Sequence, residues 1–290
     1  MRVVRLWLED FRCHASLEVA LDAGVTVLTG ANGCGKTSVL EAMAWLSTRR
    51  SFRNAPDASL VRAGAPHAII RAEVEQQAAS IPVLVEVQIT VSGKNVIRLN
   101  RNVVRGSTSR EAFPLSSVTF APDDLELVQG PPTARREYLD DLVVEMAPRY
   151  GAVRRDLDRV LLQRGRLLRS GMRGADDLST LDVWDAKLAE TGAALVAGRL
   201  EALDRLAGPM AEAYGRIAGV TAHQGTVGVA YRSSWLEPRG GASGRAEVEA
   251  LLAETLRHNR KADVDRQTTT AGPPRDAVAL SVNELDARYQ

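Results

Sequence analysis

Eight consecutive residues near the amino terminus have the types and spacing that bind a polyphosphate. The segment Gly30-Ala-Asn-Gly-Cys-Gly-Lys-Thr37 matches the pattern Gly-x-x-x-x-Gly-Lys-Thr in full. Its glycines allow the backbone to curl so that successive N–H groups point at phosphate oxygens. Lys36 can then reach the β- and γ-phosphates of a nucleotide, and the Thr37 hydroxyl can hold Mg²⁺. The predicted contacts are Gly30, Ala31, Asn32, Gly33, Cys34, Gly35, Lys36, Thr37 and Ser38.

The residues on either side of this loop predict the elements that position it. Residues 25–29 form a short, β-branched, apolar run, which indicates a buried strand with neighbours on both sides. Residues 38–46 have apolar side chains at helical spacing, and a helix that starts near Lys36 adds the positive end of its dipole to the site. The alternative is a glycine-rich turn that binds nothing, but the Lys-Thr pair and the strand–loop–helix order favour a nucleotide site.

Cys34 lies inside the loop and is open to two interpretations. A helix N-terminus lowers the pKa of a thiol, so a redox-reactive group is one of them. The other, which we favour, is a small residue whose side chain points away from the phosphates. The chain has only one more cysteine, Cys13, and four scattered histidines, so neither a disulfide framework nor a zinc site is predicted.

Length and composition indicate an ordinary folded protein. At about 150 residues per domain, 290 residues predict two domains or one domain with a large insertion. Hydrophobic residues make up 45% and charged residues 25%, which excludes wholesale disorder. The formal net charge of +1 excludes a polycationic binder but not a local basic face. Because no apolar run could span a bilayer and no signal peptide is evident, we expect a cytoplasmic protein without membrane contact.

Apolar periodicity predicts strands in the first part of the chain and helices after it. The expected strands lie at residues 3–8, 17–21 and 25–29, within 68–105, and at 118–120. Amphipathic stretches at 150–168 and 181–210, joined by a loop over 171–179, predict an antiparallel helical hairpin. A possible strand at 227–231, a helix at 247–259 and short extended runs complete the chain.

Several further segments resemble the RecF family of SMC-like ATPases, and they follow one another in order along essentially the whole chain. They are Asp10-Phe-Arg-Cys-His14, Leu40-Glu-Ala42, Arg50-Ser-Phe-Arg53, Phe120-Ala-Pro-Asp-Asp-Leu125 and Arg135-Arg136. The resemblance implies an α/β P-loop NTPase head of the ABC/SMC type with an inserted α-helical arm. The implied domains are an ATP-binding head at 1–130, an arm at 131–262, and a segment at 263–290 that returns into an incomplete head.

The resemblance also implies a function. RecF-like proteins bind ATP and Mg²⁺, dimerise around the nucleotide, bind single-stranded DNA or single-strand/duplex junctions, and act with RecO and RecR in replication, recombinational repair and the SOS response to DNA damage. By this analogy Arg12 would lie near the phosphates or the sugar of the nucleotide, and Asn32 near the γ-phosphate. The alternatives are a salt-bridged strand end for Arg12 and a turn residue for Asn32.

Three elements that SMC-like ATPases need for hydrolysis are not visible: an acidic pair after a strand (Walker B), a Ser-Gly-Gln-type signature and a D-loop. Residues 120–124 and 283–286 resemble such elements superficially. The end of the chain resembles the family segment just before the signature, with Pro274 in place of a usual His and Ala277 in place of a usual Asp. We therefore expect a chain truncated before these motifs. The alternatives are a nucleotide-binding module without hydrolysis and a P-loop small-molecule kinase.

The predicted arm has a local excess of basic residues. Residues 135–173 contain ten arginines and six acidic residues. Arg154, Arg155 and Arg159 are the candidate contacts to DNA phosphates, which would give sequence-independent, salt-sensitive binding. A solvated helix face would show the same pattern, and no aromatic residues are interleaved there to stack on bases.

Overall fold

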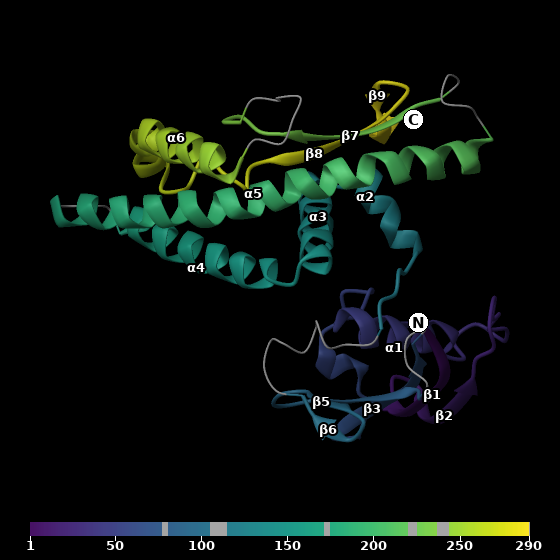
Figure 1. Cartoon of the computed structure of the whole chain (residues 1–290). Helices are drawn as coiled ribbons and strands as arrows, with labels where there is room; N and C mark the ends of the chain where they lie inside the picture. Colours follow the sequence, from purple (N-terminus) through teal and green to yellow (C-terminus); the bar gives the residue numbers. More distant parts are fainter. Residues whose placement is uncertain (77–80, 105–114, 171–174, 220–224, 237–243, 290) are drawn as a thin grey trace. The chain divides into compact units, whose positions relative to one another are not determined.

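The computed structural model describes residues 1–76, 81–104, 115–170, 175–219, 225–236 and 244–289. The chain divides into two compact units, Met1–Phe120 and Ala121–Gln290 (Figure 1). The first unit contains the predicted phosphate loop. The second contains the long helices.

The described part of the first unit is built on an antiparallel sheet in the order β2-β1-β3-β4-β5-β6. Its strands are β1 Arg2–Phe11, β2 His14–Ala20, β3 His67–Glu75, β4 Val83–Thr90, β5 Val96–Leu99 and β6 Asn102–Val103. Every second residue of β3 is buried, because successive side chains of a strand point to opposite faces of a sheet. The strands predicted at 3–8, 17–21 and within 68–105 are confirmed.

Helix α1, Lys36–Thr48, covers the apolar face of this sheet. Val39, Ala42 and Leu46 recur at helical spacing and are buried with Trp45 against the strands. The Trp45 indole donates a hydrogen bond of 3.0 Å to Asp57 in the 3₁₀ helix η1, Asp57–Leu60. The core therefore fixes the position of α1, and with it the end of the phosphate loop.

Two predicted strands of the first unit are wrong. Residues 25–29 form no strand, and Val25 and Val27 are 92% and 74% exposed. Residues 118–120 are also irregular, with Val118 and Phe120 almost fully exposed. An apolar sequence becomes a strand only where a neighbour satisfies its backbone groups, and no described strand pairs with either segment.

The second unit combines helices with a small antiparallel sheet of the order β7-β8-β9. Its longer helices are α3 Pro132–Met146, α4 Tyr150–Arg169, α5 Ala175–Ala218 and α6 Arg245–Arg266. The short helices are η3 Pro122–Leu125, α2 Glu126–Gln129 and η4 Ala287–Tyr289. The strands are β7 Val227–Arg232, β8 Ala277–Val282 and β9 Leu285–Asp286. The strand predicted at 227–231 is confirmed, and the helix predicted at 247–259 is longer at both ends.

Helices α4 and α5 form the predicted antiparallel hairpin (Figure 1). Arg164 near the end of α4 pairs with Asp185 near the start of α5. Tyr150 at the start of α4 lies against Gly198 further along α5, where a Cβ atom would be only 2.8 Å from the tyrosine ring. The predicted loop at 171–179 is too long, since α5 already begins at Ala175 and residues 171–174 lie outside the described residues.

A buried arginine joins α5 to three other parts of the second unit. Arg199 is 3% exposed and binds both carboxylate oxygens of Asp140 on α3, at 2.6 and 2.9 Å. It also donates to the carbonyl oxygen of Pro273 at 2.9 Å and to the hydroxyl of Tyr231 at 3.2 Å. This guanidinium therefore links helices, sheet and the loop that follows α6.

Arg199→Leu leaves the Asp140 carboxylate buried without its partner. We expect the free energy of unfolding to fall by about 3–5 kcal/mol, because loss of one member of a buried ion pair leaves an uncompensated charge. Arg205→Leu is the matched control, since Arg205 and Glu201 form an exposed pair at 3.9 Å that contributes little. Urea denaturation followed by circular dichroism measures both, and equal effects would contradict this role of Arg199.

Candidate nucleotide-binding site

The glycines of the loop adopt a backbone conformation that other residues rarely tolerate. Gly30, Gly33 and Gly35 have φ values of 144°, 82° and 96°. A Cβ atom at Gly35 would also lie 2.3 Å from Nε2 of His14 and 2.6 Å from Sγ of Cys13. Position 35 therefore requires glycine for two reasons: its backbone dihedral angles and the close approach of the β1–β2 turn.

Lys36 is the first residue of α1 and folds back over the loop that precedes it. Its ammonium group donates hydrogen bonds of 2.8 Å to the carbonyl oxygens of Gly30 and Ala31. It also lies 3.8 Å from Sγ of Cys34, whose side chain is exposed. The lysine thus closes the loop into a ring and holds a positive charge at the helix N-terminus, where the free N–H groups of α1 point.

A pocket of about 720 Å³ opens beside the loop. Seven residues of the predicted site line it: Arg12, Asn32, Gly33, Gly35, Lys36, Thr37 and Ser38. The remaining predicted contacts, Gly30, Ala31 and Cys34, are in the loop but not in the lining. No Asp or Glu is among the described residues that line this pocket, so the pocket is a cationic cavity.

Five other lining residues were not among the nucleotide contacts predicted from the sequence. They are Cys13, Arg53, Ser59, Val61 and Ala63. Arg53 is exposed and brings a third cation to the pocket beside Lys36 and Arg12. The segment Arg50-Ser-Phe-Arg53 could have identified it, because arginine suits bidentate contacts to phosphate.

Arg12 lines the pocket and is also held in an ion pair. It lies in the turn between β1 and β2 and binds Glu41 through Nε at 2.9 Å and NH2 at 2.7 Å. It donates a third hydrogen bond to the carbonyl oxygen of Ser59 at 3.0 Å. The salt-bridged strand end that the sequence left as an alternative is therefore present, and it fixes Arg12 at the wall of the pocket.

Glu41 is the fully buried partner in this pair. Burial by itself raises the pKa of a carboxyl group, but hydrogen bonds from Arg12 and from the hydroxyl of Ser51, together with the positive charges of Arg12 and Arg53, bring the pKa of Glu41 below its ordinary value. Glu41 is thus ionised at neutral pH and serves to position Arg12.

The two segments that resemble catalytic motifs have local structural roles. In residues 120–124, the Asp124 carboxylate accepts a hydrogen bond of 2.6 Å from the backbone N–H of Ala121 at the start of η3. In residues 283–286, Asn283 and Glu284 have φ values of 51° and 66° and form the two-residue turn between β8 and β9.

The candidate DNA contacts on α4 are partly engaged within the protein. Arg154 is half-buried and pairs with Asp141 at 2.8 Å, whereas Arg155 and Arg159 are exposed. Arg159 pairs with Asp156 one turn away at 3.2 Å. Two more of the ten arginines counted in this region, Arg135 and Arg164, are buried, so the count overestimates the basic surface.

The described residues contain no helix that is both long and apolar enough to cross a membrane. They also contain no cluster of three or more His, Cys, Asp or Glu side chains that could hold a metal ion.

Comparison with known proteins identifies the family. A family model described as an AAA domain matches residues 5–128. The RecF DNA replication and repair protein of Kineococcus radiotolerans is 42% identical over 301 residues, covering 99% of this chain and 75% of the relative. That of Frankia alni is 40% identical over 99% of this chain and 76% of the relative. The chain belongs to the RecF family.

Solved RecF structures confirm the fold. The recombination mediator protein RecF-ATPrS in the RecFOR pathway superposes with a TM-score of 0.87 at 25% identity, over 99% of this chain and 75% of that one. The corresponding RecF-ATP structure gives 0.86. The predicted family and the predicted P-loop NTPase head of the ABC/SMC type are thus confirmed, and this RecF chain has a role in DNA replication and repair.

Glu41→Gln tests the electrostatic support of Arg12. Because the pKa of Glu41 is lowered in the folded state, its stabilising contribution is present above the ordinary pKa of about 4.3 and is lost as the pH falls through the folded-state value. The difference in unfolding free energy between parent and variant should therefore narrow from about pH 7 to about pH 3. Glu75→Gln, which breaks an exposed pair with Arg2, is the control. A difference for Glu41→Gln that does not change with pH would contradict the assignment.

Proposed function

We propose that residues 30–38 and Arg12 bind ATP with Mg²⁺. The observation that carries this proposal is the curled glycine loop at the N-terminus of α1, which opens on a cationic pocket of about 720 Å³. Free N–H groups at a helix start and a ring of left-handed glycines favour a polyphosphate over other ligands. The similarity to the RecF-ATP structure supports ATP as the nucleotide.

Each residue of the loop has a specific task in this proposal. The backbone N–H groups of residues 33–38 surround the phosphates, and Lys36 exchanges its contacts with the Gly30 and Ala31 carbonyls for phosphate oxygens. The Thr37 hydroxyl holds Mg²⁺, which neutralises charge between neighbouring phosphates. Arg53 supplies an additional guanidinium group that can bind a phosphate through two hydrogen bonds. Arg12 contacts the sugar or a phosphate from its fixed position.

We propose nucleotide binding, rather than turnover, as the activity of this pocket. Hydrolysis needs a carboxylate to orient Mg²⁺ and water. No Asp or Glu is among the described lining residues, and the nearby Glu41 is buried and engaged by Arg12 and Ser51. The kinase alternative also lacks support: a kinase needs arginines in a lid over the phosphates, and the Arg135-Arg136 pair binds backbone carbonyls of the second unit.

We further propose that this chain binds DNA in the cytoplasm. Single-stranded DNA or single-strand/duplex junctions are the substrates, RecO and RecR the partners, and a second copy of the chain the partner around ATP. The solved RecF proteins of the RecFOR pathway support this assignment. The exposed Arg155 and Arg159 are candidate contacts to DNA, whereas Arg154 is engaged with Asp141.

The functional division of the chain is likewise a proposal. It assigns residues 1–130 to the ATP-binding head, 131–262 to the arm and 263–290 to a return segment. Within the last segment, β8 pairs with β7 and β9, inside the second unit.

Lys36→Ala should abolish tight ATP binding. A charge-assisted hydrogen bond contributes about 1.5–3 kcal/mol, so we expect the Kd to rise by about 10- to 100-fold. Titration with a fluorescent ATP analogue in the presence of Mg²⁺ measures this Kd. Removal of Mg²⁺ with EDTA should weaken nucleotide binding by the parent but not by a Thr37→Ala variant. Lys94→Ala, in the turn between β4 and β5, is the control and should bind like the parent. Equal affinity of Lys36→Ala and the parent would contradict the proposal.

A further inference from the structure

A second pocket, of about 340 Å³, lies in the helical unit and shares no described lining residue with the nucleotide site. Its walls are the end of α4 and the segment that follows α6. Two arginines, Arg169 and Arg275, and two threonines, Thr268 and Thr269, provide its polar lining. Neither Asp nor Glu is among the described lining residues, so the charged side chains of the lining are both cationic.

The polar groups of this pocket are placed as hydrogen-bond donors. The Thr269 hydroxyl oxygen accepts a hydrogen bond of 2.7 Å from the buried Arg164, which leaves the hydroxyl hydrogen of Thr269 for another partner. Thr268 is placed in the same way by Arg275, at 3.4 Å. A ligand that satisfies such a lining must accept hydrogen bonds.

Both arginines have guanidinium N–H donors that are not used by any residue that the structure describes. Arg275 uses Nε on the carbonyl oxygen of Thr269, at 3.2 Å, and NH2 on Thr268, so NH1 has no partner among the described residues. Arg169 makes no hydrogen bond or ion pair with any residue that the structure describes. Its guanidinium lies against Gly165, where a Cβ atom would be 3.2 Å from NH1. Two exposed guanidinium groups in one pocket favour a negatively charged ligand.

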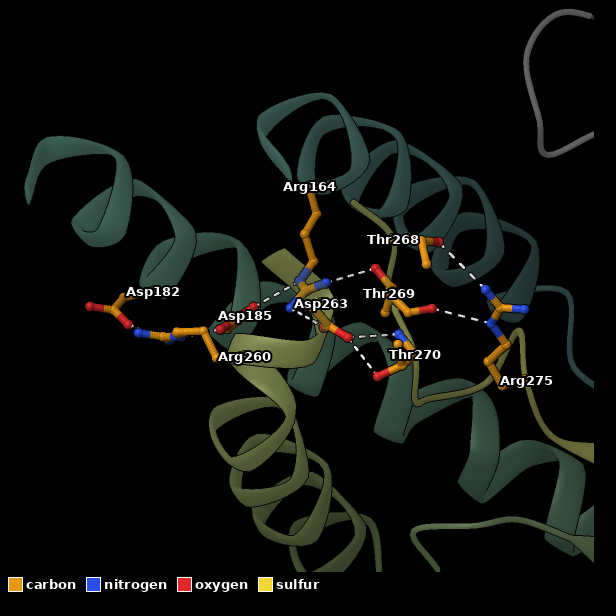
Figure 2. Close-up of polar contacts among 9 residues, drawn as sticks. All are labelled: Arg164, Asp182, Asp185, Arg260, Asp263, Thr268, Thr269, Thr270 and Arg275. Atoms are coloured by element: carbon orange, nitrogen blue, oxygen red, sulfur yellow. Dashed lines mark hydrogen bonds and ion pairs between the residues drawn. The ribbon is translucent and has the colours of Figure 1, made fainter. Parts of the chain in front are cut away.

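A buried ionic cluster connects α4, α5 and α6 to the segment that follows α6 (Figure 2). Arg164 on α4 is 0% exposed and pairs with Asp185 on α5 and Asp263 on α6, each at 2.8 Å. Asp263 also accepts hydrogen bonds from the backbone N–H and the hydroxyl of Thr270, at 2.9 and 2.6 Å. Asp185 and Asp263 are thus buried and engaged within the protein.

The segment after α6 is fixed from its other end as well. Arg199 holds the carbonyl oxygen of Pro273, and the Asp276 carboxylate accepts hydrogen bonds from Tyr231 and Trp235 at 2.6 and 2.9 Å. The donors that belong to this segment, Thr268, Thr269 and Arg275, are therefore positioned before any ligand arrives, which lowers the entropy that binding costs.

We infer that this pocket binds a phosphate group of the DNA backbone. A phosphodiester presents two acceptor oxygens and one negative charge, which match a guanidinium fork and adjacent hydroxyl donors. The other described lining residues are Leu161, Gly165, Ala271 and Pro274, so no aromatic ring is available to stack on a nucleobase. Backbone contact without base contact gives sequence-independent binding. The inference rests on the proposed DNA binding and adds the residues that carry it.

The test compares two double variants of the full chain that lose the same charge. Arg169→Gln/Arg275→Gln removes the pocket arginines, and Arg205→Gln/Arg216→Gln removes two exposed arginines of α5 that have no proposed role in DNA binding. Fluorescence anisotropy with labelled single-stranded and junction DNA is measured over a range of salt concentrations. We expect the pocket variant to bind DNA about tenfold more weakly, with a salt slope lower by about 0.7–0.9 for each lost phosphate contact. The α5 variant should change less in both quantities.

Three controls make the result decisive. Both variants should bind ATP like the parent, because none of the four arginines lines the nucleotide pocket. An Arg169→Lys/Arg275→Lys variant should retain the salt slope but bind DNA more weakly. Lysine keeps the positive charge but cannot make the two parallel hydrogen bonds of a guanidinium group. Titration with inorganic phosphate, monitored by calorimetry, tests whether the pocket takes a free anion instead.

The remaining outcomes overturn either the inference alone or the inference together with DNA binding by this chain. If the parent binds DNA and the pocket variant binds it equally well, the inference is wrong while the proposed function stands. If the pocket variant loses affinity for inorganic phosphate but not for DNA, the pocket is a free-anion site and the inference is again wrong. If the parent does not bind DNA at low salt, DNA binding by this chain and the inference fall together, and ATP binding is unaffected.

Discussion

The first unit depends on the backbone conformation of three glycines. Gly30, Gly33 and Gly35 bend the chain into a loop that ends at the first residue of α1, and Lys36 closes that loop through two of its carbonyl oxygens. The β1–β2 turn can approach only because position 35 has no side chain. The sheet and the buried face of α1 then serve to hold this one curved segment of backbone at a fixed place.

Arginine carries much of the remaining organisation, and burial decides what each one does. Arg12 is fixed by a buried carboxylate at the wall of the nucleotide pocket, and Arg164 and Arg199 cross-link helices in the interior of the second unit. Arg169 and Arg275 are exposed and have donors left for a ligand. A chain with a formal charge of only +1 can thus present local cationic sites, because acidic residues close to them, such as Glu41 and Asp263, are buried and paired with other arginines.

The phosphate loop, most strands and the helical hairpin could be predicted from the sequence, because each has a local pattern. Residues 25–29 could not, since an apolar β-branched run indicates a strand but does not tell whether a neighbour lies beside it. The basic surface of α4 was overestimated for a similar reason: Arg154 and Arg164 find their acidic partners in distant segments. The pocket formed by Arg169 and Arg275 joins residues more than 100 positions apart, which no local spacing reveals.

The central claim is that the backbone amides of the loop hold the triphosphate. Hydrogen–deuterium exchange of the full chain, with and without Mg·ATP, tests it at the residues concerned. We expect slower exchange of the backbone amides of residues 30–38 when Mg·ATP is added, and no comparable change when adenosine is added in its place. Unchanged exchange in the loop at saturating Mg·ATP, with protection elsewhere or nowhere, would contradict it.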